Sequence, residues 1–122
     1  MPNDELEEGA RLIYKLFRTP EMAGFVAASV TAGAPVDVAD GFVHFSTAGQ
    51  LAETAARHFT AEDGLWLLAC DPAALGPALR WEPSRGGALF PHLYRPLARA
   101  DLVWARPLPR GTGGHVFPDG LE

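Results

Sequence analysis

The sequence predicts an α+β domain whose sheet is mainly antiparallel and is accompanied by two main helices. Short runs of strand-forming residues and two stretches of helical spacing follow one another in mixed order, which is typical of that class. The 122 residues are 48% hydrophobic and 20% charged, the composition of a chain with a real core. We expect a single domain over residues 11–108, between a flexible acidic tail at 1–10 and a flexible tail at 109–122.

The composition also argues against several classes of protein. The formal net charge of −5 is unsuited to sequence-independent binding of nucleic acid, which needs a basic surface. No apolar run approaches the roughly 20 residues of a membrane span, and the acidic N-terminus does not resemble a signal peptide. The single cysteine, Cys70, rules out an internal disulfide and is expected to be buried. We expect a cytoplasmic protein with neither a membrane nor a nucleic acid as partner.

Residues 12–17 predict the first strand, because they are rich in strand-forming side chains. Lys15 places a charge in the middle of this apolar run. Either the strand lies at an edge and the amine extends to water, or the cation points into a cleft.

The first helix is expected to begin at Thr19, where a capping hydroxyl is followed by Pro20 and by the acidic Glu21. It should end near Gly33, with a loop at 33–40. The apolar residues at helical spacing, which we expect in the core, are Met22, Phe25, Val26 and Val30.

Residues 40–47 predict a turn, a short strand and the start of the second helix. Side chains alternate along a strand, so His44 and Ser46 share a face. Thr47 can cap the helix that follows, with Gln50 as its capping-box partner. His44 would then precede a helix N-terminus, where unpaired N–H groups favour anions.

The second helix ends near His58, which we expect to cap its C-terminus at the surface. Residues 65–70 are nearly all apolar and predict a central strand covered on both faces. A short capped turn of helix is expected at 71–76 and another strand at 79–82. The Gly-rich loop at 84–87 has bare backbone amides that suit an anion.

Two more extended segments lie at 89–97 and 102–106. Prolines interrupt the first of them, which predicts an edge strand or a wall of a cleft. His92 and Tyr94 alternate there and share a face, either as part of a pocket or as a cross-strand polar pair.

Seven polar residues stand among apolar ones on four separate segments. Convergence of such residues on one cleft is the usual form of a small-molecule site. His44 is a candidate general base, anion donor or ligand clamp, or else a satisfied core histidine. Glu82 is a candidate electrostatic stabiliser, or else it forms a salt bridge with Arg80 or Arg85. A metal site of His44, His92 and Glu82 lacks ligand spacing, so we expect no metal. The seven are Lys15, His44, Ser46, Arg80, Glu82, His92 and Tyr94.

Several short motifs follow one another along the chain: Ile-Tyr-Lys at 13–15, Gly-Phe-Val-His-Phe-Ser-Thr at 41–47, Asp-Pro at 71–72 with Leu-Gly at 75–76, Arg-Trp-Glu-Pro at 80–83, and Phe-Pro-His-Leu-Tyr-Arg-Pro-Leu at 90–97. Together they resemble DUF952, a family of small bacterial domains of unknown function, over residues 12–108. The resemblance implies a compact ADP-ribosyltransferase-like fold. In that fold a split, mainly antiparallel sheet borders a cleft for a nicotinamide dinucleotide.

The resemblance implies that NAD, or a related nucleotide or phosphorylated ligand, lies against His44, Ser46 and Thr47. Many members of the family carry a histidine after the Ile-Tyr pair, whereas this chain has Lys15 there. Because lysine cannot accept a hydrogen bond, Lys15 is unsuited to the role of that histidine in holding the ligand. His44 is then the more important candidate for this role. The implied catalytic residues are His44 and Glu82; the implied ligand contacts are Lys15, Arg80 and Arg85 at phosphate, with His92 and Tyr94 in the pocket wall.

Two alternatives to this interpretation remain open. In the first, the chain is an interaction module that keeps the fold and has lost the chemistry, and it would tolerate loss of His44 and Glu82. In the second, weaker alternative it is a metal-assisted hydrolase, which would require a stoichiometric ion.

Overall fold

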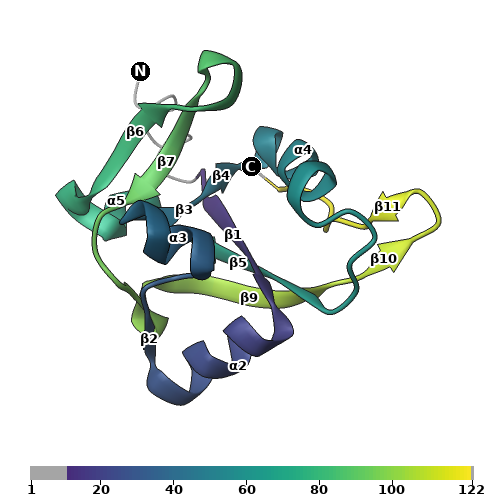
Figure 1. Cartoon of the computed structure of the whole chain (residues 1–122), viewed down its shortest axis with the longest axis horizontal. Helices are drawn as coiled ribbons and strands as arrows, with labels where there is room; N and C mark the ends of the chain where they lie inside the picture. Colours follow the sequence, from purple (N-terminus) through teal and green to yellow (C-terminus); the bar gives the residue numbers. More distant parts are fainter. Residues whose placement is uncertain (1–10, 122) are drawn as a thin grey trace.

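The computed structural model describes residues 11–121, except for the side chain of Arg85 (Figure 1). The tail predicted at 1–10 lies outside these residues. No helix in the described part of the chain is long and apolar enough to cross a membrane. The helices are α2 (Thr19–Ala28), α3 (Pro35–Asp40), α4 (Ala48–His58) and α5 (Pro72–Leu75), with 3₁₀ turns η1 (Gly76–Ala78), η2 (Arg85–Gly87) and η3 (Arg99–Asp101).

The strands form two main sheets and two short ribbons. The larger sheet has the order β4-β1-β5-β9, the smaller has the order β3-β7-β6, and β2–β8 and β10–β11 are two-stranded. All the strand pairings in the described residues are antiparallel. The α+β class with mainly antiparallel sheets is therefore confirmed. The strands are β1 (Ile13–Arg18), β2 (Val30–Thr31), β3 (Val43–His44), β4 (Ser46–Thr47), β5 (Leu65–Cys70), β6 (Leu79–Pro83), β7 (Leu89–Leu93), β8 (Leu97–Ala98), β9 (Leu102–Leu108), β10 (Arg110–Gly111) and β11 (Gly114–His115).

The chain passes from the smaller sheet to the larger one at Phe45. Strand β3, just before it, pairs with β7, whereas β4, just after it, pairs with β1. The Phe45 side chain is buried, and its N–H donates to the carbonyl of Pro91 at 2.9 Å. The single strand predicted here is thus two short strands in different sheets, and His44 and Ser46 lie on either side of the crossing.

The centre of the larger sheet buries side chains on both faces. On β1, Ile13 and Phe17 pack in the apolar cluster that includes α2, while Tyr14 and Leu16 pack in the cluster that includes α4. Strand β5 lies between β1 and β9 and alternates between the same two clusters. This confirms the predicted central strand at 65–70. Burial of each large apolar side chain contributes roughly 1.5–3 kcal/mol.

Helix α2 begins where the sequence predicts but ends well before Gly33. Ser29 adopts the left-handed conformation, with φ 67°, and its N–H donates to the carbonyl of Phe25, which closes the helix. Val26 and Val30 are 46% and 48% exposed, so the prediction that these two side chains belong to the core is wrong.

The predicted loop at 33–40 contains helix α3. Pro35 occupies its first turn, and the Asp37 carboxylate accepts a hydrogen bond from the N–H of Ala34 at 2.7 Å. Gly41 ends the helix with φ 87°, a conformation that favours glycine. A helix this short carries no apolar repeat, and tertiary contacts rather than propensity stabilise it. That is why the sequence pattern missed it.

The proline-containing segment at 89–93 is the central strand of the smaller sheet, so the edge strand, one of the two alternatives for 89–97, is wrong. Phe90 and His92 on this strand line a cavity, in agreement with the other alternative, a wall of a cleft. The carbonyl of Pro91 points toward Phe45, so its ring nitrogen lies on the same side of β7. The β3 ladder on that side ends at the pair His44–His92. The missing N–H of Pro91 therefore falls where no partner strand needs it.

The segment at 109–122, predicted as a flexible tail, contains the hairpin β10–β11. The ring Nε2 of His115 donates to the carbonyl of Glu62 at 2.8 Å, and Phe117 packs against the cluster that includes α4. The sequence analysis did not predict these strands, because glycine and proline dominate the segment.

Candidate functional site

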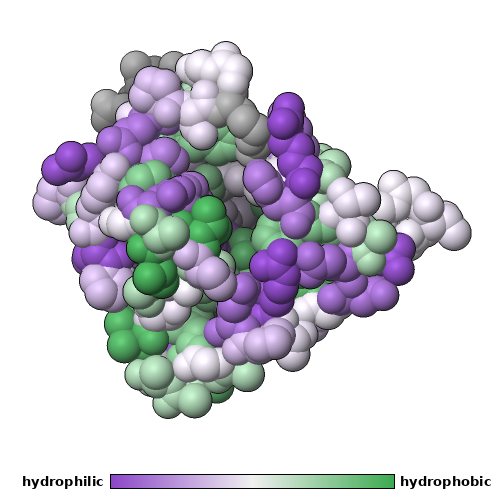
Figure 2. Space-filling view, in the orientation of Figure 1, coloured by the Kyte–Doolittle hydropathy of each residue, from purple (hydrophilic) through white to green (hydrophobic). Residues whose placement is uncertain are grey.

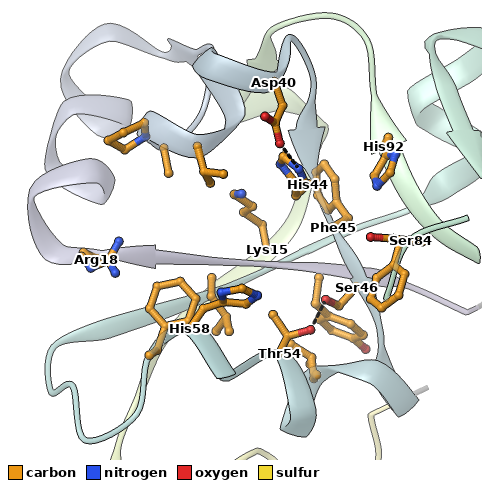
Figure 3. Close-up of a pocket in the computed structure, with 18 residues that line it drawn as sticks. Lys15, Arg18, Asp40, His44, Phe45, Ser46, Thr54, His58, Ser84 and His92 are labelled. Atoms are coloured by element: carbon orange, nitrogen blue, oxygen red, sulfur yellow. Dashed lines mark hydrogen bonds and ion pairs between the residues drawn. The ribbon is translucent and has the colours of Figure 1, made fainter. Parts of the chain in front are cut away.

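A cavity of about 600 Å³ opens beside β1. Strand β4 pairs with β1 only as far as Tyr14, and the following residues of β1 border the cavity. Helices α3 and α4 and strand β7 contribute further walls, and this face of the molecule is hollowed between α3 and α4 (Figure 2). The polar side chains that line the cavity are Tyr14, Lys15, Arg18, Asp40, His44, Ser46, Thr54, His58, Ser84 and His92 (Figure 3).

Lys15, which lines the cavity, forms a buried ion pair with Asp37 of helix α3. The Lys15 Nζ lies 2.7 Å from Oδ2 of Asp37, and the two residues are only 5% and 1% exposed. The other oxygen, Oδ1, accepts from the backbone N–H of His44 at 3.0 Å and lies 2.6 Å from Nδ1 of the same residue. One carboxylate therefore ties β1, α3 and β3 together.

The two charges of this pair depend on each other. Burial lowers the pKa of Lys15, although the charge of Asp37 acts in the opposite direction. Burial would raise the pKa of Asp37, but the hydrogen bonds from His44 and the charge of Lys15 outweigh it, and that pKa lies below its usual value. The interpretation of Lys15 as an edge residue that extends to water is wrong, since its amine is buried beside the cavity.

His44 contacts a carboxylate through each ring nitrogen. Its Nδ1 faces Asp37, and its Nε2 lies 3.0 Å from Oδ2 of Asp40 (Figure 3). Each ring nitrogen thus has a carboxylate oxygen within hydrogen-bond distance. Asp40 is much more exposed than Asp37, with 47% of its side chain accessible, so the contact at Nε2 lies at the solvent side.

His92 lies on β7 opposite His44 of β3, and its Nδ1 also contacts a carboxylate. Its Nδ1 lies 2.8 Å from Oε1 of Glu82 on β6, and the same oxygen accepts from the hydroxyl of Tyr94 at 2.7 Å. The hydrogen bonds from Tyr94 and His92 lower the pKa of Glu82, and the hydrogen bond to Glu82 raises the pKa of Tyr94. Glu82 is therefore an ionised acceptor at neutral pH.

The ring of Phe42 connects these two groups. Its centroid lies 4.5 Å from that of His44, 4.2 Å from that of His92 and 5.1 Å from that of Tyr94. The two imidazole centroids are 5.4 Å apart. The sequence analysis assigned no role to Phe42.

The hydroxyl side of the cavity is formed by Ser46 and Thr54, whose oxygens lie 3.0 Å apart (Figure 3). Thr47 is the N-cap residue of α4, and its N–H donates to Oε1 of Gln50 at 3.0 Å, which confirms the predicted capping partner. Thr47 itself is not among the residues that line the cavity.

The structure brings together some of the predicted residues and separates others. Lys15, His44, Ser46 and His92 line the cavity, while the remaining described candidates lie outside its lining. Arg80 packs over the ring of Tyr94, 4.9 Å from its centroid, and not at a phosphate position in the cavity. The candidates outside the lining are Thr47, Arg80, Glu82 and Tyr94, and the side chain of Arg85 lies outside the described part of the structure.

The sequence analysis did not identify several residues in or beside the cavity as candidates for the site. Arg18 brings a second cation to the lining and is bound to Glu62 at 2.9 Å. His58 lines the cavity from the last turn of α4, where it was expected only as a surface cap. Asp37 was missed because its partner on β1 lies far away in sequence, and no local pattern indicates that pairing.

Two further expectations concerned a metal and an anion loop. Among residues 11–121, no group of three or more His, Cys, Asp or Glu side chains is placed to hold a metal ion. In the loop at 84–87, the N–H of Ser84 donates to the carbonyl of Ala88, and the N–H of Gly87 donates to the carbonyl of Ser84. These two amides are already used within the loop.

The fold and site define a small α+β domain in which two antiparallel sheets meet beside a cavity lined by imidazoles. The chain belongs to the DUF952 family, described as a protein of unknown function, whose model matches residues 16–105. No curated protein matches the chain.

Solved structures of one relative have the same fold. The crystal structure of protein CC0527 from Caulobacter crescentus is 43% identical, with a TM-score of 0.81, over 85% of this chain and 91% of that chain. The solution NMR structure of CC0527 is also 43% identical, with a TM-score of 0.77, over 85% of this chain and 90% of that chain. This similarity supports the family and the fold.

Proposed function

We propose that this domain binds NAD or a related nucleotide or phosphorylated ligand in the cavity beside β1, in an arrangement like the cleft of ADP-ribosyltransferase-like folds. The observation that carries the proposal is the cavity itself, because its size falls within the range of small-molecule sites. The division of the chain into two antiparallel sheets at Phe45 agrees with a split-sheet cleft.

The charges in the described lining favour an anion. Lys15 and Arg18 are cationic, and three imidazoles join them, whereas Asp40 is the acidic residue of that lining. The hydroxyls of Ser46 and Thr54 can donate to phosphate oxygens. Lys15 and Arg18 both have carboxylate partners, so they contribute a modest field and specific hydrogen bonds rather than a strong positive charge.

Aromatic side chains supply surfaces for a flat ring. Phe45, Phe59 and Phe90 line the cavity, and each comes from a different segment. A nicotinamide or adenine ring against such faces gains stacking and apolar burial. The cavity therefore offers both kinds of contact that a nucleotide needs.

Titration calorimetry with NAD, ADP-ribose and AMP tests this proposal. Val36 of α3 lines the cavity, whereas Val38 on the same helix does not, and both side chains are exposed at 57% and 62%. V36W should fill the cavity and weaken binding at least about tenfold. V38W is the matched control and should bind like the wild type. No binding at millimolar ligand, or equal affinities for the two variants, would refute nucleotide binding in this cavity.

One observation favours an interaction module as second candidate: the Lys15 cation is already neutralised by Asp37 within the protein. A module of this kind would show no heat with any of the three nucleotides, and V36W would leave the cellular phenotype of the wild type intact. Metal analysis of the purified protein addresses the hydrolase alternative, which requires one ion per chain.

A further inference from the structure

We propose that His44 and His92 are an acid–base pair that hydrolyses a phosphodiester bound in the cavity. This inference rests on the proposed function, because it needs a phosphorylated ligand beside these two rings. It adds a reaction, a substrate class and separate roles for the two imidazoles.

Each imidazole is oriented by a carboxylate at Nδ1. Asp37 holds His44 at 2.6 Å, and Glu82 holds His92 at 2.8 Å. A carboxylate in this position fixes the ring and places its proton at Nδ1 in the neutral form, which leaves Nε2 to react. A satisfied core histidine needs one such contact at most, whereas here two oriented rings line the same cavity.

The base is His92. It is 5% exposed, and within residues 11–121 no hydrogen bond reaches its Nε2. No buried side-chain nitrogen or oxygen in that part of the chain lacks a partner, so this atom is not sealed in the core. The His92 ring lines the cavity (Figure 3) and Glu82 holds its Nδ1, so Nε2 is the nitrogen left to accept a proton from a ligand there.

The acid is His44, whose second nitrogen faces a second carboxylate. When the ring carries both protons, Nδ1 has Asp37 as acceptor and Nε2 has Asp40. Asp40 is half exposed and carries the kind of negative charge that a phosphate would bring, so it marks the place of the ligand's anion at Nε2. A bound phosphate would displace Asp40 and accept from the same nitrogen.

The spacing of the rings suits one phosphoryl group. Their centroids are 5.4 Å apart, and Phe42 packs against both and fixes their separation. A general acid or base acts over about 3 Å, so two rings this close can serve oxygens of the same phosphoryl group. Lys15 lies in the same wall and can stabilise charge on the non-bridging oxygens.

The step balances without any further reactant. A water oxygen attacks phosphorus while Nε2 of His92 takes its proton. The bond from phosphorus to the leaving oxygen breaks, and Nε2 of His44 transfers its proton to that oxygen. A phosphomonoester and an alcohol result, and the two rings return to their starting states by exchange of protons with water. Glu82 is a positioning residue in this scheme, because it acts through His92.

The test substrate is 2′,3′-cyclic AMP, a phosphodiester whose product is a single adenosine monophosphate that chromatography can follow. The variants are H92Q, E82Q and H115Q. His115 is a matched histidine control, since it is bonded to the carbonyl of Glu62 and does not line the cavity. Calorimetry with 3′-AMP measures binding separately from turnover, and circular dichroism checks that each variant folds.

We expect the wild type to hydrolyse the substrate with a bell-shaped pH profile of kcat/KM, since one imidazole must be neutral and the other charged. H92Q should lower kcat at least about 100-fold and remove the acidic limb of the profile. E82Q should lower kcat with little change in KM and should move that same limb, which a merely structural role would not do. H115Q should leave both parameters unchanged.

If the wild type binds 3′-AMP but does not hydrolyse the diester, the acid–base inference is overturned while nucleotide binding survives. If it does neither, the acid–base inference is overturned, and nucleotide binding is overturned with it when NAD, ADP-ribose and AMP also fail to bind. Should H92Q fail to fold, E82Q decides, because an unaltered pH profile in that variant contradicts the assignment of His92 as base.

Discussion

Replacement of Asp37 by asparagine tests the network on which the whole site depends. The carboxylate accepts from the N–H of Ala34 and of His44 and contacts Nδ1 of His44 and Nζ of Lys15, at 2.6 to 3.0 Å. An asparagine side chain has one acceptor oxygen, so its NH₂ group would face at least one of these donors. The variant also leaves the Lys15 ammonium buried without a counter-charge.

Loss of one member of a buried ion pair costs about 3–5 kcal/mol, because the other charge stays desolvated. The side chains of Lys15 and Asp37 are only 6% and 0% exposed, so solvent screening does not reduce this figure. For a domain of this size the loss corresponds to a fall in Tm of roughly 10–20 °C. A natural domain has only about 5–15 kcal/mol in total, so D37N removes a large share of the stability of the domain.

The assay is urea unfolding followed by circular dichroism, with D63N as control. Asp63 is also ion-paired, to Arg110 at 2.9 Å, but its side chain is 75% exposed, and D63N should leave the midpoint almost unchanged. The double variant K15M/D37N removes both charges and should be more stable than D37N alone. A midpoint for D37N equal to that of D63N, or a double variant less stable than D37N, would refute the reasoning.

Two further predictions concern pH and the exposed carboxylate. Because the pKa of Asp37 is lowered in the folded state, its contribution to stability is fully present above about pH 5 and is lost as the pH falls through the folded-state value. Urea midpoints of the wild type should therefore fall steeply below about pH 4, and in D37N this part of the pH dependence should be absent; parallel curves would contradict the assignment. D40N should bind 3′-AMP several-fold more tightly than the wild type by calorimetry, since it removes the negative charge that competes for Nε2 of His44. Weaker binding in D40N would show that Asp40 supports the site instead of occupying it.

Local patterns were enough to predict several elements and part of the site. The apolar run at 65–70 identified the central strand, and Asp71 caps the short helix α5 through the N–H of Ala73, as its sequence indicates. Strand alternation indicated that His44 and Ser46 could serve one surface, and both line the cavity. These features depend on neighbours within a few residues, so the sequence carries them directly.

Tertiary structure alone decided which carboxylate serves which histidine. Asp37 was predicted in a loop, yet it joins Lys15 of β1 to His44 of β3, and burial makes that pairing obligatory for each charge. Glu82 meets His92 because β6 and β7 pair in one register. Contacts of this kind follow from the order of the strands and from the exclusion of water. Neither can be predicted from the spacing of residues along the chain.

By itself, the sequence determined the class of the domain, its family and four of the polar side chains that line the cavity, because composition, periodicity and capping act locally. The tertiary structure decided that Lys15 is buried, that β7 is central and that the chain changes sheets at Phe45. It also placed Glu82 outside the cavity lining, bonded to His92. The physical reason is that a cavity and its charges are set by contacts between distant segments, and their stability depends on desolvation that only the assembled fold creates.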